Sequence, residues 1–340
     1  MKNLNQLFLF IYVLTLISCN FSEPEKELNP SLVLWYNKPA NGWTEAMPIG
    51  NGRLGAMIYG GNTTDTIQFN EETLWSGQPH DYAHPGAFQY LGKIRNLLWA
   101  GKQEEATNLA NEQFMSQPFG QQCYQPFGNI LLNFPGHENA INYKRKLDLE
   151  DAISTVSYEV EGVKFKRETF SSAPDQALVM RIESSKNRTL NFAVGMNSPH
   201  SNYTVSVEGD EIVLRGKANN YPKEKGPDGY PYPESKLTFE ARLKVVQEGG
   251  ALVQTENSIK VENAKTATLC LVAATSFVSY NDINADPRLP AAGWLVLHVC
   301  FRLRRSSAGY ALIQGMHLLN AQSRRPFATV GVEKSQELRG

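Results

Sequence analysis

Hydrophobic and polar residues alternate along most of this chain between Tyr124 and Ala274. An apolar side chain at every second position is the period of a strand with one face in a core. Polar turns separate ten such segments, so the pattern predicts a sandwich of two large antiparallel sheets. The segments are residues 130–134, 153–160, 163–170, 176–182, 190–196, 203–207, 212–216, 237–246, 258–261 and 266–274.

One helical region interrupts the strands, between residues 85 and 115. Apolar residues recur there at three and four positions, the spacing of one helix face, and Gly101 provides a stop between two runs. These runs predict a short helical hairpin packed on a sheet, with Trp99 in the core. The apolar positions are Phe88, Leu91, Ile94 and Leu98 in the first run and Ala106, Leu109 and Ala110 in the second.

The stretch from Trp43 to Gly77 has the most specialised composition in the chain. Its residues 48–53 predict a turn, because Gly50 and Gly52 adopt positive φ without steric cost. Two short strands are expected after the turn. These strands, residues 54–59 and 65–69, deliver residues 70–75 to the rim of the sandwich.

This stretch resembles the N-terminal domain of glycoside hydrolase family 95, a family composed mostly of α-L-fucosidases. The resemblance covers residues 32–287 and implies a mainly β fold, an antiparallel β-supersandwich. It also implies an enzyme whose (α/α)6 barrel follows the sandwich and carries the catalytic residues of an inverting glycosidase. The matching segments are residues 43–57, 69–77, 124–129, 143–149 and 165–172.

Nothing that resembles the barrel follows in this chain. Inverting hydrolysis needs a general acid and a base about 6.5–9.5 Å apart, and the motif carboxylates have no counterpart in either role. We therefore expect a truncated N-terminal domain that is inactive alone and has no catalytic residue. The carboxylates concerned are Glu45, Glu71, Glu72 and Asp81, and structural roles are expected for Glu45 and Glu72.

Three residues at the end of the second strand are candidates for a substrate-proximal position: Asn70, Glu71 and Trp75. Packing fixes their backbone, and a rigid strand end gives a site residue positional precision. Trp75 offers a ring face and an indole N–H to a sugar, while the other two supply donors and acceptors. The alternative is that Trp75 plugs the sandwich edge and Glu71 pairs with an arginine such as Arg53.

A long loop, residues 219–234, carries three tyrosines among four prolines. Aromatic rings on a proline-stiffened loop can stack on sugars, whereas the plainer interpretation is a surface connection that is longer than usual. The tyrosines are Tyr221, Tyr230 and Tyr232.

The N-terminus predicts export. Residues 1–19 combine Lys2, a short apolar run and the sequence Leu-Ile-Ser-Cys, the features of a signal peptide. This ending resembles a bacterial lipobox, which would make Cys19 a lipidated residue at a periplasmic or surface membrane. The alternative is an ordinary signal peptide in which the cysteine is incidental. Residues 20–31, which follow, are expected to form a tether.

The C-terminal residues 288–340 differ in composition from the rest. They contain 7 Arg and one Lys, against 8 Arg and 17 Lys in residues 1–287, and their acids are Glu333 and Glu337. We interpret them as a tail from outside the family; a divergent C-terminus with short helices is the alternative.

The formal net charge of −1 gives no reason to expect nucleic acid. No cofactor or metal is expected, since the histidines lack ligand spacing, and two isolated thiols are favoured over a bridge for Cys123 and Cys270. The expected partners are fucosylated or related glycans, through the full-length enzyme, and the barrel domain. Two alternatives remain: a carbohydrate-binding sandwich without catalysis, and a supersandwich of the glycoside phosphorylase type. The sequence does not decide between fucose and galactose as the sugar of the full-length enzyme.

Overall fold

The computed structural model of the chain describes residues 29–220 and 229–288. The chain divides into two units, residues 1–33 and 34–340. The described part of the first contains the 3₁₀ turn η1 (Pro30–Leu32). The predicted signal peptide with Cys19, most of the tether, Tyr221 and all of the C-terminal tail beyond Arg288 lie outside the described residues.

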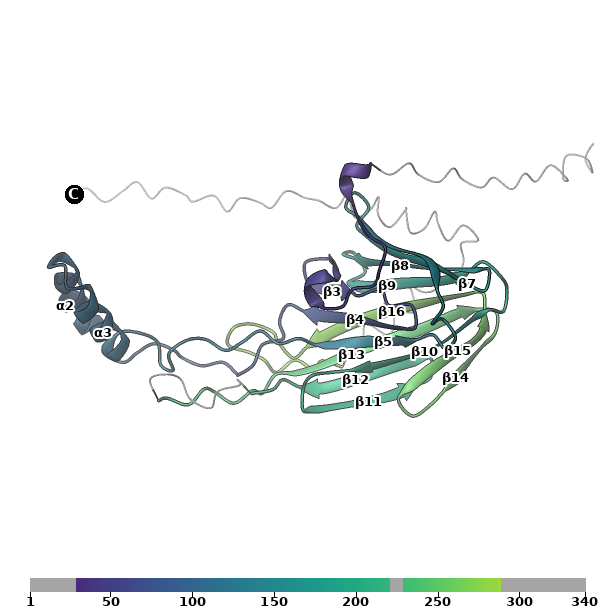
Figure 1. Cartoon of the computed structure of the whole chain (residues 1–340). Helices are drawn as coiled ribbons and strands as arrows, with labels where there is room; N and C mark the ends of the chain where they lie inside the picture. The colour runs from purple at the N-terminus through teal and green to yellow at the C-terminus, as the bar shows by residue number, and fades with distance from the viewer. Residues whose placement is uncertain (1–28, 221–228, 289–340) are drawn as a thin grey trace, which may run out of the picture. The chain divides into compact units, whose positions relative to one another are not determined.

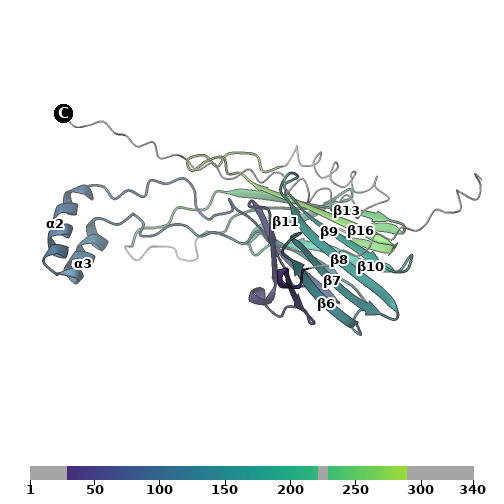
Figure 2. The ribbon, with the colours of Figure 1, turned by 90° about the horizontal axis from the view of Figure 1, so that it is seen from above.

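The second unit contains two antiparallel sheets, as the alternation predicted (Figure 1). Figure 2 shows strands β6 to β9 of the larger sheet side by side. The larger sheet has nine strands, in the order β1 (Val33–Tyr36), β6 (Ile141–Asp148), β7 (Ile153–Val160), β8 (Val163–Ser172), β9 (Ala177–Ser184), β16 (Thr266–Thr275), β13 (Thr238–Glu248), β12 (Glu211–Lys217) and β11 (Asn202–Glu208). The smaller sheet has seven, in the order β14 (Ala251–Gln254), β15 (Ser258–Ala264), β10 (Leu190–Asn197), β5 (Gly128–Asn133), β4 (Thr64–Glu71), β3 (Leu54–Ile58) and β2 (Met47–Gly50).

The core lies between the inward faces of the two sheets. Every second residue of β4 is buried from Asp65 to Glu71, the burial that period-two alternation predicts. Phe127 links the sheets, because its ring centroid lies 5.3 Å from that of Phe69 and 4.8 Å from that of Phe239. Burial of such aromatic side chains supplies much of the hydrophobic stabilisation of a sandwich.

A buried ion pair also joins the sheets. Arg167 in β8 lies 3.3 Å from Asp65 in β4, and both side chains are almost completely buried. Asp65 accepts hydrogen bonds from the amides of Gly60 and Gly61, at 2.8 and 2.9 Å. Arg167 donates to the carbonyl of Gly61 at 2.6 Å, so the pair fixes the turn between β3 and β4 against the larger sheet.

The predicted glycine turn begins later than expected. Gly50 belongs to β2 and pairs with Gly55 of β3, so its backbone is extended and the prediction of positive φ there was wrong. The turn consists of Asn51, Gly52 and Arg53, with φ 97° at Gly52. The Asn51 side chain accepts from the amides of Arg53 and Leu54, at 3.1 and 2.8 Å, so an asparagine closes this turn.

The helical hairpin is present, but its predicted packing was wrong. Helices α2 (Phe88–Trp99) and α3 (Gln103–Gln113) pack on each other, and Gly101, with φ 74°, separates them. Ala106 is the one fully buried residue of the two helices. Trp99 is 79% exposed, not a core residue, because the half-buried face of α2 holds Ile94 and Leu97 instead.

Two further observations concern the cysteines and the helices of the described residues. Cys123 and Cys270 are both free thiols in the part of the chain that the structure describes. None of the helices in the described ranges has both the length and the apolar character needed to cross a bilayer.

Candidate functional site

The motif carboxylate Glu71 is the last residue of β4 and is buried, with 3% exposure. Its side chain accepts from the amide of Thr73 at 2.8 Å and from the Thr73 hydroxyl at 2.6 Å. Arg53 Nη1 lies 3.3 Å from the other carboxylate oxygen. The alternative that pairs Glu71 with Arg53 is therefore confirmed, and the geometry gives Glu71 a positioning role.

Arg53 extends this contact to the larger sheet. Its Nε donates to the side chain of Gln176 at 2.7 Å, and Nη1 donates to the carbonyl of Ala273 at 2.8 Å. The hydroxyls of Thr73 and Thr275 also form a hydrogen bond. These contacts join the end of β4 to the end of β16 and the start of β9. The end of β4 is therefore a fixed point, from which the backbone after Glu71 begins.

An exposed aromatic pair follows this fixed point. Trp75 and Tyr124 form an isolated β-bridge, and their rings lie 5.6 Å apart with an interplanar angle of 58°. They are 46% and 41% exposed, so Trp75 does not plug the sandwich edge as the alternative supposed. The Trp75 indole N–H donates to the carbonyl of Glu72 at 3.1 Å, so the ring face, rather than the N–H, is open to a ligand.

Hydrogen bonds to the backbone hold the pair in place. The Tyr124 hydroxyl donates to the carbonyl of Glu71 at 3.2 Å, and the Asn70 side chain accepts from the amide of Phe127 at 3.1 Å. Partial burial raises the pKa of Tyr124, and the charges of Glu71 and Glu72 add to this effect. The phenol is therefore neutral over the physiological range and remains a hydrogen-bond donor.

The two chain segments beyond the aromatic pair are tied to the long loop. The amide of Gly77 donates to the hydroxyl of Ser235 at 2.7 Å, and the Tyr232 hydroxyl donates to the carbonyl of Phe119 at 2.9 Å. Tyr232 thus has a bonding role within the protein, whereas Tyr230 is 47% exposed. Sugar stacking by the tyrosines of this loop stays a prediction.

His200 joins the bases of the same loops. Its Nδ1 accepts from the amide of Asn219 at 2.9 Å, so the proton lies on Nε2, 3.1 Å from the carbonyl of Pro126. Burial lowers the pKa of His200. The neutral imidazole that this bonding requires is therefore the favoured form.

The other motif carboxylates have separate partners. Glu45 accepts from the amide of Asn41 at 3.0 Å, and Asp81 accepts from the amide of Ala83 at 2.9 Å, both as turn contacts. Glu72 is exposed. Within residues 29–220 and 229–288, no group of three His, Cys, Asp or Glu side chains is placed to hold a metal ion.

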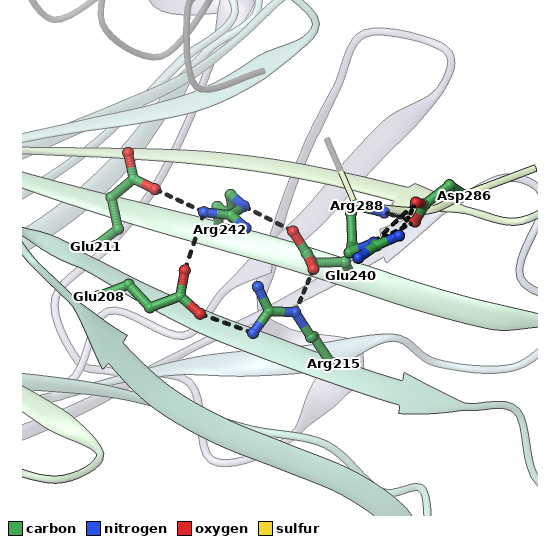
Figure 3. A network of polar contacts seen from close by, with 7 residues as sticks. All are labelled: Glu208, Glu211, Arg215, Glu240, Arg242, Asp286 and Arg288. Atoms are coloured by element: carbon green, nitrogen blue, oxygen red, sulfur yellow. Dashed lines mark hydrogen bonds and ion pairs between the residues drawn. The ribbon is translucent and has the colours of Figure 1, made fainter. Parts of the chain in front are cut away.

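A second charged cluster lies on the outer face of β12 and β13 (Figure 3). Glu240 is fully buried, and it receives Arg215 Nε at 2.5 Å and Arg242 Nε at 2.6 Å. Arg215 and Arg242 also contact Glu208, at 2.8 and 3.5 Å, and the Arg215 hydrogen bond lowers the pKa of Glu208. Each of these carboxylates is paired with a guanidinium, so the cluster stabilises the sheet and offers no proton-transfer group.

Asn70, Glu71 and Trp75 do occupy one strand end, as predicted, but they are not equivalent. Trp75 is accessible, Asn70 is half-buried and Glu71 is enclosed. Sequence reasoning missed Tyr124 as the partner of Trp75, although it begins one of the family-like segments, residues 124–129.

The two antiparallel sheets, with the motif at the end of β4, define a β-sandwich domain. The chain belongs to the family described as "Glycosyl hydrolase family 65, N-terminal domain", which it matches over residues 34–280. It is 35% identical to "Alpha-L-fucosidase 2" of Arabidopsis thaliana over 280 residues, which cover 78% of this chain and 33% of that protein. It is 27% identical to "Probable alpha-fucosidase A" of Aspergillus niger over 265 residues, 73% of this chain and 31% of that protein.

The chain thus spans about a third of the length of the curated relatives it matches. These relatives agree with the resemblance to an α-fucosidase family. Among solved structures, the "Putative kojibiose phosphorylase from human microbiome" aligns with a TM-score of 0.45 and 11% identity, covering 86% of this chain and 38% of that one. That likeness is too weak to carry an argument.

Proposed function

We propose that this chain is the N-terminal domain of an exported α-L-fucosidase-type hydrolase whose catalytic residues lie in a separate barrel domain. The names of the relatives support the substrate class. The buried contacts of Glu71 and the turn contacts of the exposed Glu45 and Asp81 support structural roles for these motif carboxylates rather than an acid and base pair. Inverting catalysis would need two such groups about 6.5–9.5 Å apart.

The exposed pair of Trp75 and Tyr124 is the observation that carries this proposal. Large aromatic side chains left in water beside a rigid base mark a binding surface. In the complete enzyme this loop faces the barrel and lines the approach to its sugar pocket. The pair contributes contact area but no proton transfer, because Tyr124 stays neutral and Trp75 has no titratable group.

Kinetics of the complete enzyme test this role. We expect Trp75→Ala to raise KM for a fucosylated substrate while kcat keeps its pH profile, since only binding is removed. Trp43→Ala is the matched control, because Trp43 is also exposed, at 57%, and lies outside the aromatic pair. Unchanged kinetics together with a large loss of thermal stability would show that Trp75 has only a packing role.

The chain by itself should not hydrolyse fucosides. We expect fucose release from a fucosylated oligosaccharide to stay at the level of a heat-denatured sample. Turnover that is abolished by Glu71→Gln would place a catalytic site in this domain and refute the proposal.

The same aromatic pair favours a second candidate, a carbohydrate-binding sandwich without catalysis. Calorimetric titration of the chain with a fucosylated oligosaccharide separates the two candidates. Saturable binding that Trp75→Ala removes supports the second candidate, whereas no binding by the chain alone agrees with a site that needs the barrel.

A further inference from the structure

His200 lies in the turn between β10 and β11 and bonds to two segments that are distant in the sequence. Its side chain is buried, with 2% exposure, and its ring centroid lies 4.9 Å from that of Phe239. Its Nε2 donates to the carbonyl of Pro126, two residues after Tyr124, and its Nδ1 accepts from the amide of Asn219. The imidazole is therefore directly tied to the segment that carries Tyr124.

The contact with Asn219 continues to the segment of Trp75. The Asn219 carbonyl accepts from the hydroxyl of Ser235 at 2.5 Å, and the same hydroxyl accepts from the amide of Gly77 at 2.7 Å. Ser235 is fully buried, so its hydroxyl depends on these partners. Because Gly77 lies two residues after Trp75, three consecutive hydrogen bonds join His200 to the base of the tryptophan.

This arrangement requires a neutral imidazole. A neutral ring has one N–H donor and one acceptor nitrogen, whereas a protonated ring has two donors. A proton on Nδ1 would face the amide N–H of Asn219, whose nitrogen lies 2.9 Å away, so this hydrogen bond would be lost. The side-chain oxygen of Asn219 favours the charged ring, but it already accepts from the amide of Ser201 at 2.9 Å, and a turn toward the proton would break that bond instead. Protonation therefore disturbs Asn219 by either route, whereas Nε2 stays a donor to Pro126.

The surroundings of His200 favour the neutral ring. Burial lowers the pKa of the imidazole below its ordinary value of about 6.5, although the contacts with Pro126 and the Asn219 side chain oppose this shift. The neutral form therefore persists until the solution is acidic. The titratable groups on the surrounding segments are Glu71 paired with Arg53, the neutral Tyr124, Lys217 paired with Glu234, the exposed Lys236, and Glu240 paired with Arg215 and Arg242.

We propose that His200 is the positioning residue of the surface formed by Trp75 and Tyr124, and that a proton on its Nδ1 loosens the segment of Trp75. Tyr124 stays tied to His200 through Pro126, so the two rings lose their fixed relation. The surface is therefore ordered at neutral pH and loosened in acid. Only the consequence for sugar binding rests on the proposed function, since the hydrogen bonds belong to this chain alone.

Fluorine NMR of the full 340-residue chain, labelled with 5-fluorotryptophan, tests the proposal. The chain has five tryptophans, and Trp75→Phe assigns the signal of Trp75. We expect this signal to shift or broaden as the pH falls from about 7.5 to about 5, around the usual histidine pKa. Its midpoint should equal that of the ring-proton signal of His200. The signal of Trp43, which is also exposed but lies outside the bonded segments, should not follow this midpoint.

The variant His200→Asn separates positioning from folding. Its Oδ1 can take the place of Nδ1 as the acceptor for the Asn219 amide, but an amide gains no proton in this pH range. The Trp75 signal of this variant should therefore keep its neutral-pH position throughout. His137→Asn is the matched control, because His137 is also buried with a lowered pKa but contacts the Tyr158 hydroxyl instead. It should leave the titration of Trp75 unchanged.

Three results would overturn the proposal. The first is a Trp75 signal that stays constant until the chain unfolds, and the second is an unaltered Trp75 titration in His200→Asn. The third is a simultaneous change of all five tryptophan signals, which marks global unfolding.

Kinetics of the complete enzyme test the consequence for binding separately. The ratio of the wild-type KM to the KM of His200→Asn should rise in acid, because only the wild-type surface is loosened. A constant ratio beside the expected fluorine shifts would refute the binding role of the surface and leave the positioning role of His200 intact.

Discussion

Replacing Arg53 by methionine should destabilise this protein more than replacing Glu71, although the two residues form one ion pair. The two side chains differ in their access to water, with 29% exposure for Arg53 and 3% for Glu71. Without Arg53, the Glu71 carboxylate stays enclosed and keeps only its hydrogen bonds from Thr73. Without the Glu71 charge, Arg53 still donates to Ala273 and Gln176 and can be hydrated.

The magnitudes follow from this asymmetry. Removal of one partner from a buried pair costs about 3–5 kcal/mol, and the partial exposure of Arg53 places Arg53→Met near the lower limit. Glu71→Gln keeps an acceptor for Thr73 and should cost about 1–1.5 kcal/mol, the value of an ordinary hydrogen bond. For a domain of this size, a loss of 3 kcal/mol lowers Tm by about 6–12 °C. The double variant should cost less than the sum, because both changes remove one interaction.

Urea unfolding followed by tryptophan fluorescence measures these differences as shifts of the midpoint at constant slope. Glu72→Gln is the control, because Glu72 is the exposed neighbour of Glu71 and should change stability by less than about 0.5 kcal/mol. Equal costs for Arg53→Met and Glu71→Gln would refute the burial argument. So would an Arg53→Met variant as stable as the control.

Two further predictions concern pH and export. Burial lowers the pKa of His137 and of His200, whereas a histidine in the unfolded chain has a pKa of about 6.5. Between the folded and unfolded pKa values the unfolded chain therefore binds more protons, so the free energy of unfolding should rise with pH through this window and fall in acid. A His200→Asn variant whose free energy of unfolding has the same pH dependence as the wild type would contradict the assignment to His200. Expression in a bacterium that is fed labelled fatty acid should label the chain, and Cys19→Ser should abolish the labelling. Wild-type protein that stays unlabelled would favour the ordinary signal peptide.

Local pattern was sufficient to predict the sandwich. Burial at every second residue is a property of the strand itself, so β7 was predicted with both of its limits, Ile153 and Val160. Strand β6 was missed because its first residues, from Ile141, are exposed and its pairing shifts between Ile141 and Lys144. An irregular strand leaves no regular period for the sequence to display.

The hairpin shows where a local pattern is ambiguous. Apolar residues on α2 occupy two faces, and spacing alone assigned Phe88 and Leu98 to the packed one. The contact with α3 selects Ile94 and Leu97 and leaves Phe88 and Trp99 in water. Which face packs depends on the neighbour, and helical periodicity carries no information about the neighbour.

The sequence by itself determined the strand pattern, the special composition of residues 43–77 and the candidate residues at the end of β4. Only the tertiary structure decided their roles. Trp75 meets Tyr124 across 49 positions of chain, and Glu71 becomes enclosed when Arg53 reaches Ala273 on the other sheet. Burial and partner choice arise from contacts between distant segments, whereas alternation is fixed by the geometry of a single strand.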